Sequence, residues 1–380
     1  MVDEWKIPLY KIFTDEDDLN LITKIIKRGN QWAIGPEIEE FEKLIKDYVG
    51  TDYCVTLNSG TSSLHATLLA YGISKGDKII VPSFSFIATA NCVLYVDGIP
   101  TFADIEESTF GLDPKSILDS IDEQTKAIIP MDYGGMSCDI IQIKKIAHEH
   151  NLILIEDAAE SLGSSIKENK VGSLADSAIF SFCGNKVLTT GEGGAIVTNS
   201  REVYEKTKII RSHGRVEKTS YFNDPKTSEY IDIGYNWRMS SITASLGISQ
   251  IQKLDKIIDM RKKNAQYISS RISRHIEIMV PKPPSGYDHI YQMYTIRLPN
   301  KKIRDELQKH LTNKKIFSKV YFQPIHNTKY YKTKFSKSYS SLDVTEKISN
   351  QVLTLPLYPN MTKEEKDYLI ESIDEFFENR

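Results

Sequence analysis

Seven short, mostly continuous apolar runs between residues 53 and 198 alternate with helical patterns, and this alternation limits the possible folds more than any other feature. Uninterrupted apolar runs of this length are typical of strands that helices cover on both faces. The predicted strands are Tyr53–Leu57, Lys78–Val81, Thr101–Ala103, Ala127–Pro130, Leu152–Glu156, Ser177–Phe182 and Ala195–Thr198. Strands that alternate with helices predict an α/β fold with a mainly parallel central sheet flanked by helices.

The segments on either side of this region have a different pattern. Two amphipathic helices are expected before it, from Glu16 to Arg28 and from Glu37 to about Tyr48. After residue 240 a long helical pattern covers Ser241–Asn264 and is broken only at Gly247. A Pro-rich connection then leads to further predicted elements: a strand at Tyr291–Leu298, a helix around Arg304–Asn313 and a last helix from Thr362.

This change of pattern predicts two domains. Residues 1–250 are expected to hold an N-terminal segment and a large α/β domain, and residues 251–380 a smaller α+β domain. A length of 380 residues agrees with two or three folding units.

Composition excludes several classes of protein. The 48 basic and 51 acidic residues give a net charge of −3, so neither nucleic acid nor an anionic membrane is an expected partner. No apolar window is long enough to span a membrane, and the N-terminus lacks a signal-peptide pattern, so we expect a cytoplasmic protein. The four cysteines show no CxxC pair and no metal-ligand spacing, which predicts free thiols and no metal site: Cys54, Cys92, Cys138 and Cys183.

The first chemically informative stretch is Asn58-Ser59-Gly60-Thr61, which lies between a predicted strand and a helix expected over Ser62–Tyr71. Gly60 allows a tight turn, and the amides and hydroxyls at the start of the helix suit a phosphate group. Ser and Thr are also ordinary helix caps. This stretch alone leaves both interpretations open.

The second stretch is the apolar strand that ends in Glu156 and Asp157. Open α/β sheets bind ligands beyond the carboxyl ends of their strands, where Asp157 is expected to lie. A carboxylate there suits the protonated ring nitrogen of a pyridine cofactor. A helix cap or a surface ion pair is the alternative explanation.

The third stretch runs from Ile179 to Lys186 and is followed by a glycine-rich turn, Gly191–Gly194. Most lysines are solvated, but Lys186 follows a strand that is too apolar to be exposed. Partial burial lowers the pKa of a lysine and makes its neutral, nucleophilic form accessible. Ser181, five residues earlier, is a candidate phosphate ligand.

The order of these three stretches is more specific than any one of them. A phosphate turn is followed by an aspartate that ends a strand, and then by a serine and a lysine, with Lys186 29 residues after Asp157. The chain lacks the GxGxxG fingerprint of a nicotinamide enzyme and the GxxxxGK[ST] loop of an NTPase.

With these residues in place, the chain resembles the DegT family of nucleotide-sugar aminotransferases, which use pyridoxal 5′-phosphate (PLP) on the type I fold. The resemblance covers nearly the whole chain, and as a set its motifs are highly specific. They are Gly35-Pro36, Phe41-Glu42, Asn58–Thr61, Val81–Phe84, Glu156–Ala159, Ser181…Lys186, Gly191–Gly194, Gly234–Met239, Pro324–His326 and Leu355–Pro359.

The resemblance implies a catalytic centre built on Lys186, which would hold PLP as a Schiff base and move protons between the cofactor and the substrate. Asp157 would pair with the ring nitrogen, and Glu160 would lie near the ring hydroxyl. Many members of the family have Gln where this chain has Glu160. The Met136-Ser137 pair also departs from the more usual Gln/His-Pro of the family, in a segment that borders the substrate in relatives.

The other implied contacts surround the cofactor. Gly60, Thr61 and Ser181 would hold its phosphate, and Phe86 would stack on its ring, although a core position fits Phe86 equally well. Asn236 would reach the phosphate of the partner subunit's cofactor, so the resemblance implies a homodimer with shared active sites.

Two histidines are weaker candidates for substrate contact. His213 lies in a family motif, where a structural turn is an equally good explanation. His326 lies in the Pro324–His326 segment, which relatives bring over the sugar.

The resemblance also implies a reaction. A lysine at position 186 is typical of the aminotransferases in the family, whereas sugar 3-dehydratases have His there. The Thr189–Gly194 stretch is similar to members that act on 4-keto sugars, and the chain looks most like the perosamine synthase group. The expected reaction moves the amino group of glutamate to the C4 ketone of a nucleotide-linked 4-keto-6-deoxyhexose in polysaccharide biosynthesis. A 3-keto sugar or cyclitol aminotransferase, or a non-catalytic PLP-binding regulator, is the alternative.

Overall fold

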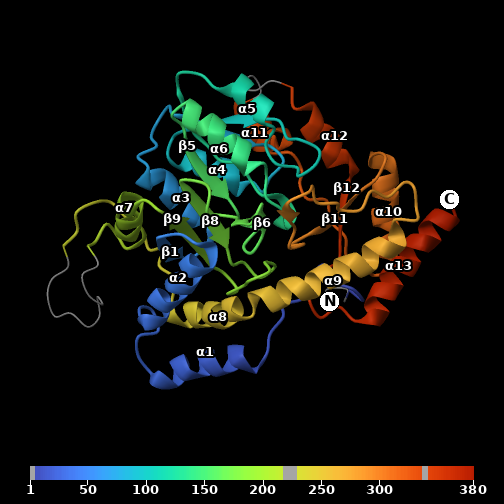
Figure 1. Cartoon of the computed structure of the whole chain (residues 1–380), viewed down its shortest axis with the longest axis horizontal. Helices are drawn as coiled ribbons and strands as arrows, with labels where there is room; N and C mark the ends of the chain where they lie inside the picture. The colour runs from blue at the N-terminus through green and yellow to red at the C-terminus, as the bar shows by residue number, and fades with distance from the viewer. Residues whose placement is uncertain (1–4, 217–228, 336–340) are drawn as a thin grey trace.

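A seven-stranded sheet forms the centre of the molecule in the strand order β1–β9–β8–β5–β4–β2–β3 (Figure 1). The structure is a computed structural model that describes residues 5–216, 229–335 and 341–380. The strands are β1 (Tyr53–Leu57), β2 (Lys78–Pro82), β3 (Ile99–Ala103), β4 (Thr125–Ile128), β5 (Ile153–Asp157), β8 (Ser177–Ser181) and β9 (Gly194–Thr198). β9 is antiparallel to β1 and β8, whereas β8, β5, β4, β2 and β3 pair in parallel. The mainly parallel sheet predicted from the sequence is confirmed.

The apolar runs form strands because both faces of the sheet are covered. On β2, Ile79 and Val81 face one core, and Ile80 faces a second core on the opposite side. On β8, Ile179 lies in the first core, whereas Phe180 belongs to a third cluster on the far face. Successive side chains of a strand point to opposite faces, so apolar residues at every position bury both.

Helices on the two faces complete the α/β sandwich (Figure 1). One face carries α3 (Gly60–Ala70), α4 (Ala88–Tyr95) and α7 (Arg201–Arg211). The other carries α2 (Pro36–Val49), α5 (Pro114–Ser120), α6 (Ile140–Glu149) and α8 (Ser241–Gln252).

Local capping residues determine where several helices begin and end. α1 (Glu16–Arg28) starts with a capping box between Asp15 and Asp18 and ends at Gly29 in the left-handed region. Both bounds agree with the helix expected from the sequence. A second capping box joins Thr362 and Glu365 at the start of α13 (Lys363–Glu378), as the predicted start at Thr362 requires.

The prediction of a helix break at Gly247 is wrong. α8 continues through Gly247, and the interruption comes at Lys253, before α9 (Leu254–Ile272). A Cβ atom on Gly247 would lie 2.4 Å from Cζ of Phe41, so the ring of Phe41 on α2 occupies the space above the glycine. Close helix packing, which a local pattern does not reveal, explains the glycine.

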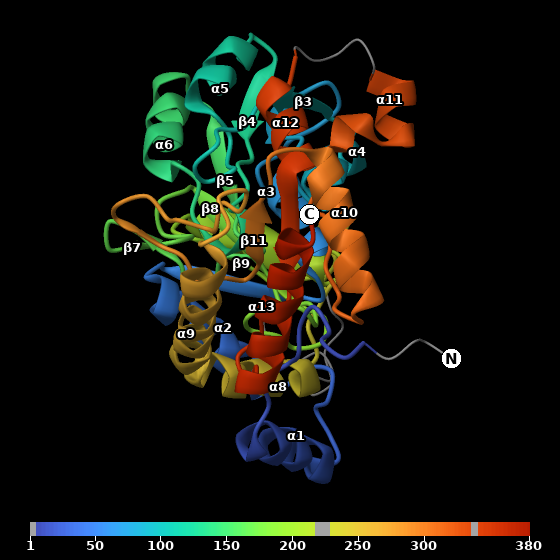
Figure 2. The same cartoon turned by 90° about the vertical axis from the view of Figure 1, so that its right-hand side faces the viewer.

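The C-terminal part of the chain forms a smaller layer beside the sheet domain, on the right in Figure 1 and facing the viewer in Figure 2. Its two-stranded sheet, β11 (Tyr294–Arg297) and β12 (Val352–Leu355), packs with α9, α10 (Lys301–Asn313) and α13 around one apolar cluster. The remaining shorter elements are η1 (Tyr133–Gly135), β6 (Ser165–Ile166), β7 (Asn169–Lys170), β10 (Tyr287–Asp288), η2 (Ile325–Asn327), α11 (Lys329–Phe335) and α12 (Asp343–Gln351).

Two segments cross between the apolar clusters. Ile7, near the N-terminus, is buried in the C-terminal cluster and forms a bridge with Ile316. α9 places Ile257 in a cluster of the sheet domain and Ile268 in the C-terminal cluster. A domain division at residue 250 therefore stays a prediction.

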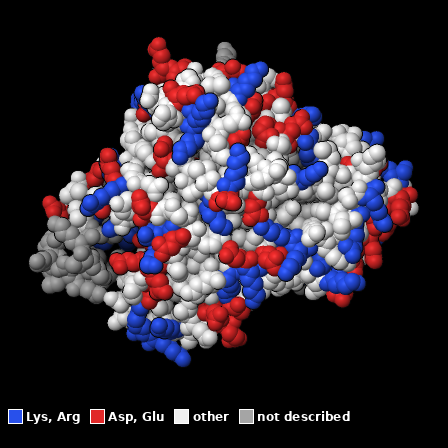
Figure 3. Space-filling model, viewed as in Figure 1, with Lys and Arg blue, Asp and Glu red and all other residues white. Residues whose placement is uncertain are grey.

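The described surface mixes both signs of charge. Lys and Arg alternate with Asp and Glu over the face in Figure 3. Among the helices that the structure describes, none is both long and apolar enough to cross a membrane.

Candidate active site

A cavity of about 360 Å³ opens at the carboxyl ends of β5 and β8, beside the N-terminus of α3. Seven residues singled out from the sequence line it together: Gly60, Thr61, Phe86, Asp157, Glu160, Ser181 and Lys186. The C-terminal part of the chain closes it with Lys319, Tyr321 and Phe322. The cavity thus lies between the sheet domain and the C-terminal layer, a common position for a ligand site.

Lys186 enters the cavity from the loop that follows β8. Its side chain is 14% exposed, and its Nζ lies 3.3 Å from Glu160 Oε1. Glu160 Oε2 accepts a hydrogen bond from Gly134 N–H at 2.9 Å. The carboxylate of Glu160 therefore connects the Lys186 amine to the η1 loop.

Asp157 ends β5 and is almost completely buried. Its Oδ2 accepts a hydrogen bond from Thr89 Oγ1 at 2.7 Å, and its Oδ1 accepts one from Ala159 N–H at 3.3 Å. Burial raises the pKa of Asp157 to about 6, against the lowering effects of Thr89, Ala159 and the nearby Lys186. A cation in the cavity would stabilise the ionised form.

A second acidic pair lies behind this carboxylate. Glu156 Oε2 accepts from Gly172 N–H at 2.7 Å, and Asp132 Oδ1 accepts from Cys138 N–H at 2.8 Å. Burial raises the pKa of Glu156 to about 7 and that of Asp132, which also faces the charge of Glu156, well above its usual range. These two carboxyl groups connect the backbone around the site and do not line the cavity, as far as the chain is described.

The N-terminus of α3 forms an anion cradle at another part of the cavity. Ser59 caps the helix by accepting from Ser62 N–H, and the first N–H groups of a helix have no partner inside it. A Cβ on Gly60 would lie 2.9 Å from Ser181 Cβ, so the missing side chain lets the helix approach β8 closely. Gly60, Thr61 and Ser181 thereby gather at one place, which suits a phosphate group.

Phe86 lies on the surface of the cavity and not in the core. The residue is 60% exposed and lies in the loop between β2 and α4. An exposed aromatic ring in a cavity offers a flat face to a planar ligand. Of the two interpretations that the sequence allowed, the structure supports the cavity position.

Three further candidates lie elsewhere. Asn236 and His213 are exposed and neighbour one another, since Ser212 pairs with Asn236 and His213 N–H donates to Tyr235. His213 has a φ of 62°, as a turn residue would. Neither Asn236 nor His213 lines the cavity within the described parts of this chain.

His326 is buried outside the cavity. Its Nδ1 lies 2.6 Å from Ser83 Oγ and its Nε2 lies 3.2 Å from Glu346 Oε1. The ring joins η2 to the end of β2 and to α12. An effect of His326 on the substrate would therefore have to pass through Ser83 or Glu346.

Several residues of the site were not found from the sequence. Thr89 holds Asp157 from a position 68 residues earlier in the chain, and a hydroxyl near the start of a mainly apolar helix gives no local signal of this contact. Tyr321 and Phe322 line the cavity from the segment just before Pro324–His326. Their position next to that motif was the feature of the sequence that could have identified them.

An amine, a buried carboxylate, an anion cradle and an exposed aromatic ring around one cavity match the groups of PLP. The amine at Lys186 suits its aldehyde, the carboxylate at Asp157 its ring nitrogen, and the N-terminus of α3 its phosphate. Burial raises the pKa of Asp157, and a protonated ring nitrogen beside it would favour the ionised carboxylate, which supports this fit. The fold and the site together define a PLP-dependent enzyme of the aminotransferase class.

Comparison with known proteins identifies the family. The model of the DegT/DnrJ/EryC1/StrS aminotransferase family matches residues 13–374, so the chain belongs to this family of sugar aminotransferases. It is 34% identical to the GDP-perosamine synthase of Escherichia coli O157:H7 over 91% of this chain and 92% of that protein.

Solved structures agree with this assignment. Helicobacter pylori PseC, an aminotransferase involved in the biosynthesis of pseudaminic acid, matches with a TM-score of 0.93 at 27% identity over 100% of both chains. The PLP form of the putative sugar aminotransferase Spr1654 from Streptococcus pneumoniae matches with a TM-score of 0.90 at 25% identity, over 98% of this chain and 99% of that one. The family and the type of enzyme expected from the sequence are confirmed.

Proposed function

We propose that this protein binds PLP on Lys186 and transfers the amino group of glutamate to the C4 ketone of a nucleotide-linked 4-keto-6-deoxyhexose. The observation that supports this most is the single cavity that joins Lys186, Asp157 and the N-terminus of α3. The similarity to a GDP-perosamine synthase over 91% of the chain favours a substrate of this kind.

The cofactor would supply an electron sink that stabilises negative charge on the substrate carbon. The buried carboxylate of Asp157 would pair with the ring nitrogen and favour its protonated form. Lys186 Nζ takes a proton from one carbon and returns it to another, as general base and general acid. Glu160, 3.3 Å from that nitrogen, holds the amine within the cavity.

The remaining residues fix the orientation of the ring. Gly60, Thr61 and Ser181 would hold the phosphate, and Phe86 would cover one face of the ring. These contacts position the reacting atoms next to Lys186, and such positioning lowers the barrier by reducing the entropy that the reaction must lose.

Asn236 serves the partner subunit in this proposal. It is exposed and lies outside the cavity of its own chain, as a residue that completes a second active site would. His213, beside it, and His326 are the proposed substrate-side residues. Mixing inactive Lys186→Ala protein with inactive Asn236→Ala protein should restore part of the activity, because one of the two mixed sites is intact. A mixture without activity would argue against shared sites.

The substrate assignment is tested by following absorbance and products separately. Glutamate alone should convert the PLP-loaded protein to its aminated form, which absorbs at shorter wavelength, and release 2-oxoglutarate. GDP-4-keto-6-deoxymannose should then reverse the spectrum and yield a 4-amino sugar. Reversal only by a 3-keto sugar nucleotide or a cyclitol would support the alternative aminotransferase. No response to glutamate or any other amino acid would indicate a PLP-binding regulator.

A further inference from the structure

The side-chain amide of Gln292 contacts both residues next to Lys186. Its Oε1 accepts a hydrogen bond from Val187 N–H at 2.7 Å, and its Nε2 donates to the carbonyl oxygen of Asn185 at 2.8 Å. Gln292 is 6% exposed, so water has little access to these bonds. One amide thus fixes the backbone on both sides of Lys186.

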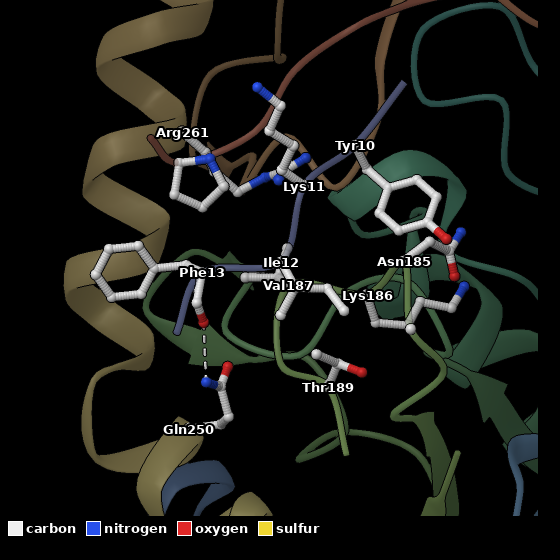
Figure 4. A pocket seen from close by; sticks show the side chains of 12 residues that line it. Tyr10, Lys11, Ile12, Phe13, Asn185, Lys186, Val187, Thr189, Gln250 and Arg261 are labelled. Atoms are coloured by element: carbon white, nitrogen blue, oxygen red, sulfur yellow. Dashed lines mark hydrogen bonds between the residues drawn. The ribbon is translucent and has the colours of Figure 1, made fainter. Parts of the chain in front are cut away.

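Gln292 is itself held from α9. Arg261 Nη2 donates to the Gln292 carbonyl at 2.9 Å, and Arg261 Nε donates to the Tyr291 carbonyl at 2.8 Å. Figure 4 shows Arg261 on α9 across a small cavity from Asn185 and Lys186. A buried guanidinium that holds two carbonyls leaves the segment before β11 little freedom.

The same segment also contacts the η1 loop. Met293 N–H donates to Gly134 O and Ile290 N–H to Gly135 O, each at 2.9 Å. Gly134 N–H in turn donates to Glu160 Oε2. The segment before β11 therefore touches both the loop that carries Lys186 and the loop that holds its partner Glu160.

We propose that Gln292 is a positioning residue that sets the direction in which Lys186 enters the cavity. Gln292 does not line that cavity within the described residues, so it acts through Lys186 and not on the substrate. The C-terminal layer, which closes the cavity with Tyr321, would through Gln292 also orient the catalytic amine. This proposal rests on the proposed role of Lys186.

The test compares Gln292→Met with a matched control elsewhere. Methionine keeps the length of the side chain and removes both hydrogen bonds. Asn264 is the control, because it is also 6% exposed and its amide also donates to backbone carbonyls, those of Tyr358 and Pro359. Asn264→Leu therefore removes an equally buried amide that donates to Tyr358 and Pro359 and not to the residues next to Lys186.

Hydrogen exchange in the cofactor-free protein gives a readout that needs no turnover. In Gln292→Met the Val187 amide should exchange faster, and PLP should attach to Lys186 more slowly. kcat should fall by roughly 10- to 100-fold with little change in KM, since misplacing a reacting group by about 1 Å costs up to about 100-fold. Asn264→Leu should leave all these quantities near those of the wild type.

A conservative variant covers the case in which Gln292→Met does not fold. Gln292→Glu keeps an oxygen acceptor for Val187 N–H, and its ionised form opposes the Asn185 carbonyl, so Val187 should stay protected while kcat falls at a pH where this carboxyl group is ionised. Unchanged Val187 exchange in Gln292→Met, or a kcat for either Gln292 variant equal to that of Asn264→Leu, would overturn the proposal. A wild-type protein without transamination would instead refute the proposed function, and the exchange and PLP-attachment measurements would still test Gln292.

Discussion

Glu160 bridges Lys186 and the η1 loop: its Oε1 lies 3.3 Å from Lys186 Nζ, and its Oε2 accepts from the buried Gly134 N–H. The two contacts make different demands on the side chain. The amine favours a negative charge, whereas the amide N–H needs only an oxygen acceptor.

The variants Glu160→Gln and Glu160→Ala distinguish the need for a negative charge from the need for an oxygen acceptor. Glutamine keeps an oxygen for Gly134 N–H, so stability should stay close to that of the wild type. Alanine leaves the buried N–H without an acceptor, which costs about 1–3 kcal/mol of unfolding free energy. Urea unfolding of both variants measures the difference. Equal destabilisation by glutamine and alanine would show that the charge, and not the acceptor, matters for the fold.

Asp157→Asn should stabilise the cofactor-free protein at neutral pH. Burial raises the pKa of Asp157 to about 6 in the folded state, from 3.8 in the unfolded chain. The folded protein therefore binds this proton more tightly, and stability falls as the pH rises from about 4 through about 6. Above that range the wild type should be less stable than Asp157→Asn by about 2–3 kcal/mol.

Urea unfolding of the cofactor-free wild type and of cofactor-free Asp157→Asn at pH 4 and pH 8 measures the difference in their unfolding free energies. The difference should vanish near pH 4, where the carboxyl group is protonated in the folded protein. PLP should reverse the order at pH 8, because its protonated ring nitrogen favours the carboxylate. A wild type that is more stable than Asp157→Asn at pH 8 without cofactor would contradict the assignment.

Glu42→Ala should be one of the most destabilising substitutions outside the site. Glu42 Oε1 lies 2.5 Å from Arg211 Nη1 and also accepts from Thr56 N–H at 2.8 Å, which connects α2, α7 and β1. Removing one partner of a buried ion pair costs about 3–5 kcal/mol, because the other charge stays buried. Lys43→Ala, which removes an exposed ion pair with Asp47 on the same helix, is the control and should change little. Similar losses for both variants would rule out a special role of the buried pair.

Gly247→Ala tests the packing of α2 on α8. The new Cβ would lie 2.4 Å from the Phe41 ring, and such overpacking costs about 1–3 kcal/mol. Adding Phe41→Leu should recover part of that loss, although Phe41→Leu alone destabilises. Thermal or urea unfolding of the two single variants and the double variant gives the coupling. Strictly additive effects would show that the ring and the glycine are not in contact.

Features that depend on neighbours in the sequence were predicted well. The strands β1, β2 and β5 lie within a few residues of the apolar runs that predicted them, and α1 has the predicted bounds. Continuous apolar runs and capping residues act locally, so their effect is visible without the rest of the fold. The predicted break at Gly247 was wrong because the glycine makes room for the ring of Phe41, about 200 residues earlier in the chain.

Several residues that line the cavity could also be predicted from the local sequence. Asp157 ends β5, Gly60 begins α3 and Lys186 follows β8, and the topology of the sheet brings them to one cavity. The residues that hold them in place could not be predicted from the sequence. Thr89 and Gln292 contact Asp157 and the Lys186 loop from distant segments, and an isolated hydroxyl or amide gives no signal in the sequence.

Covalent labelling tests the central claim most directly. The PLP-loaded protein is treated with borohydride, which makes the bond between PLP and an amine permanent, and the labelled peptide is identified by mass spectrometry. We predict a phosphopyridoxyl group on Lys186, and no label at that site in Lys186→Ala or in protein incubated without PLP. A label on another lysine of the wild type, or none at all, would contradict the claim that Lys186 carries the cofactor.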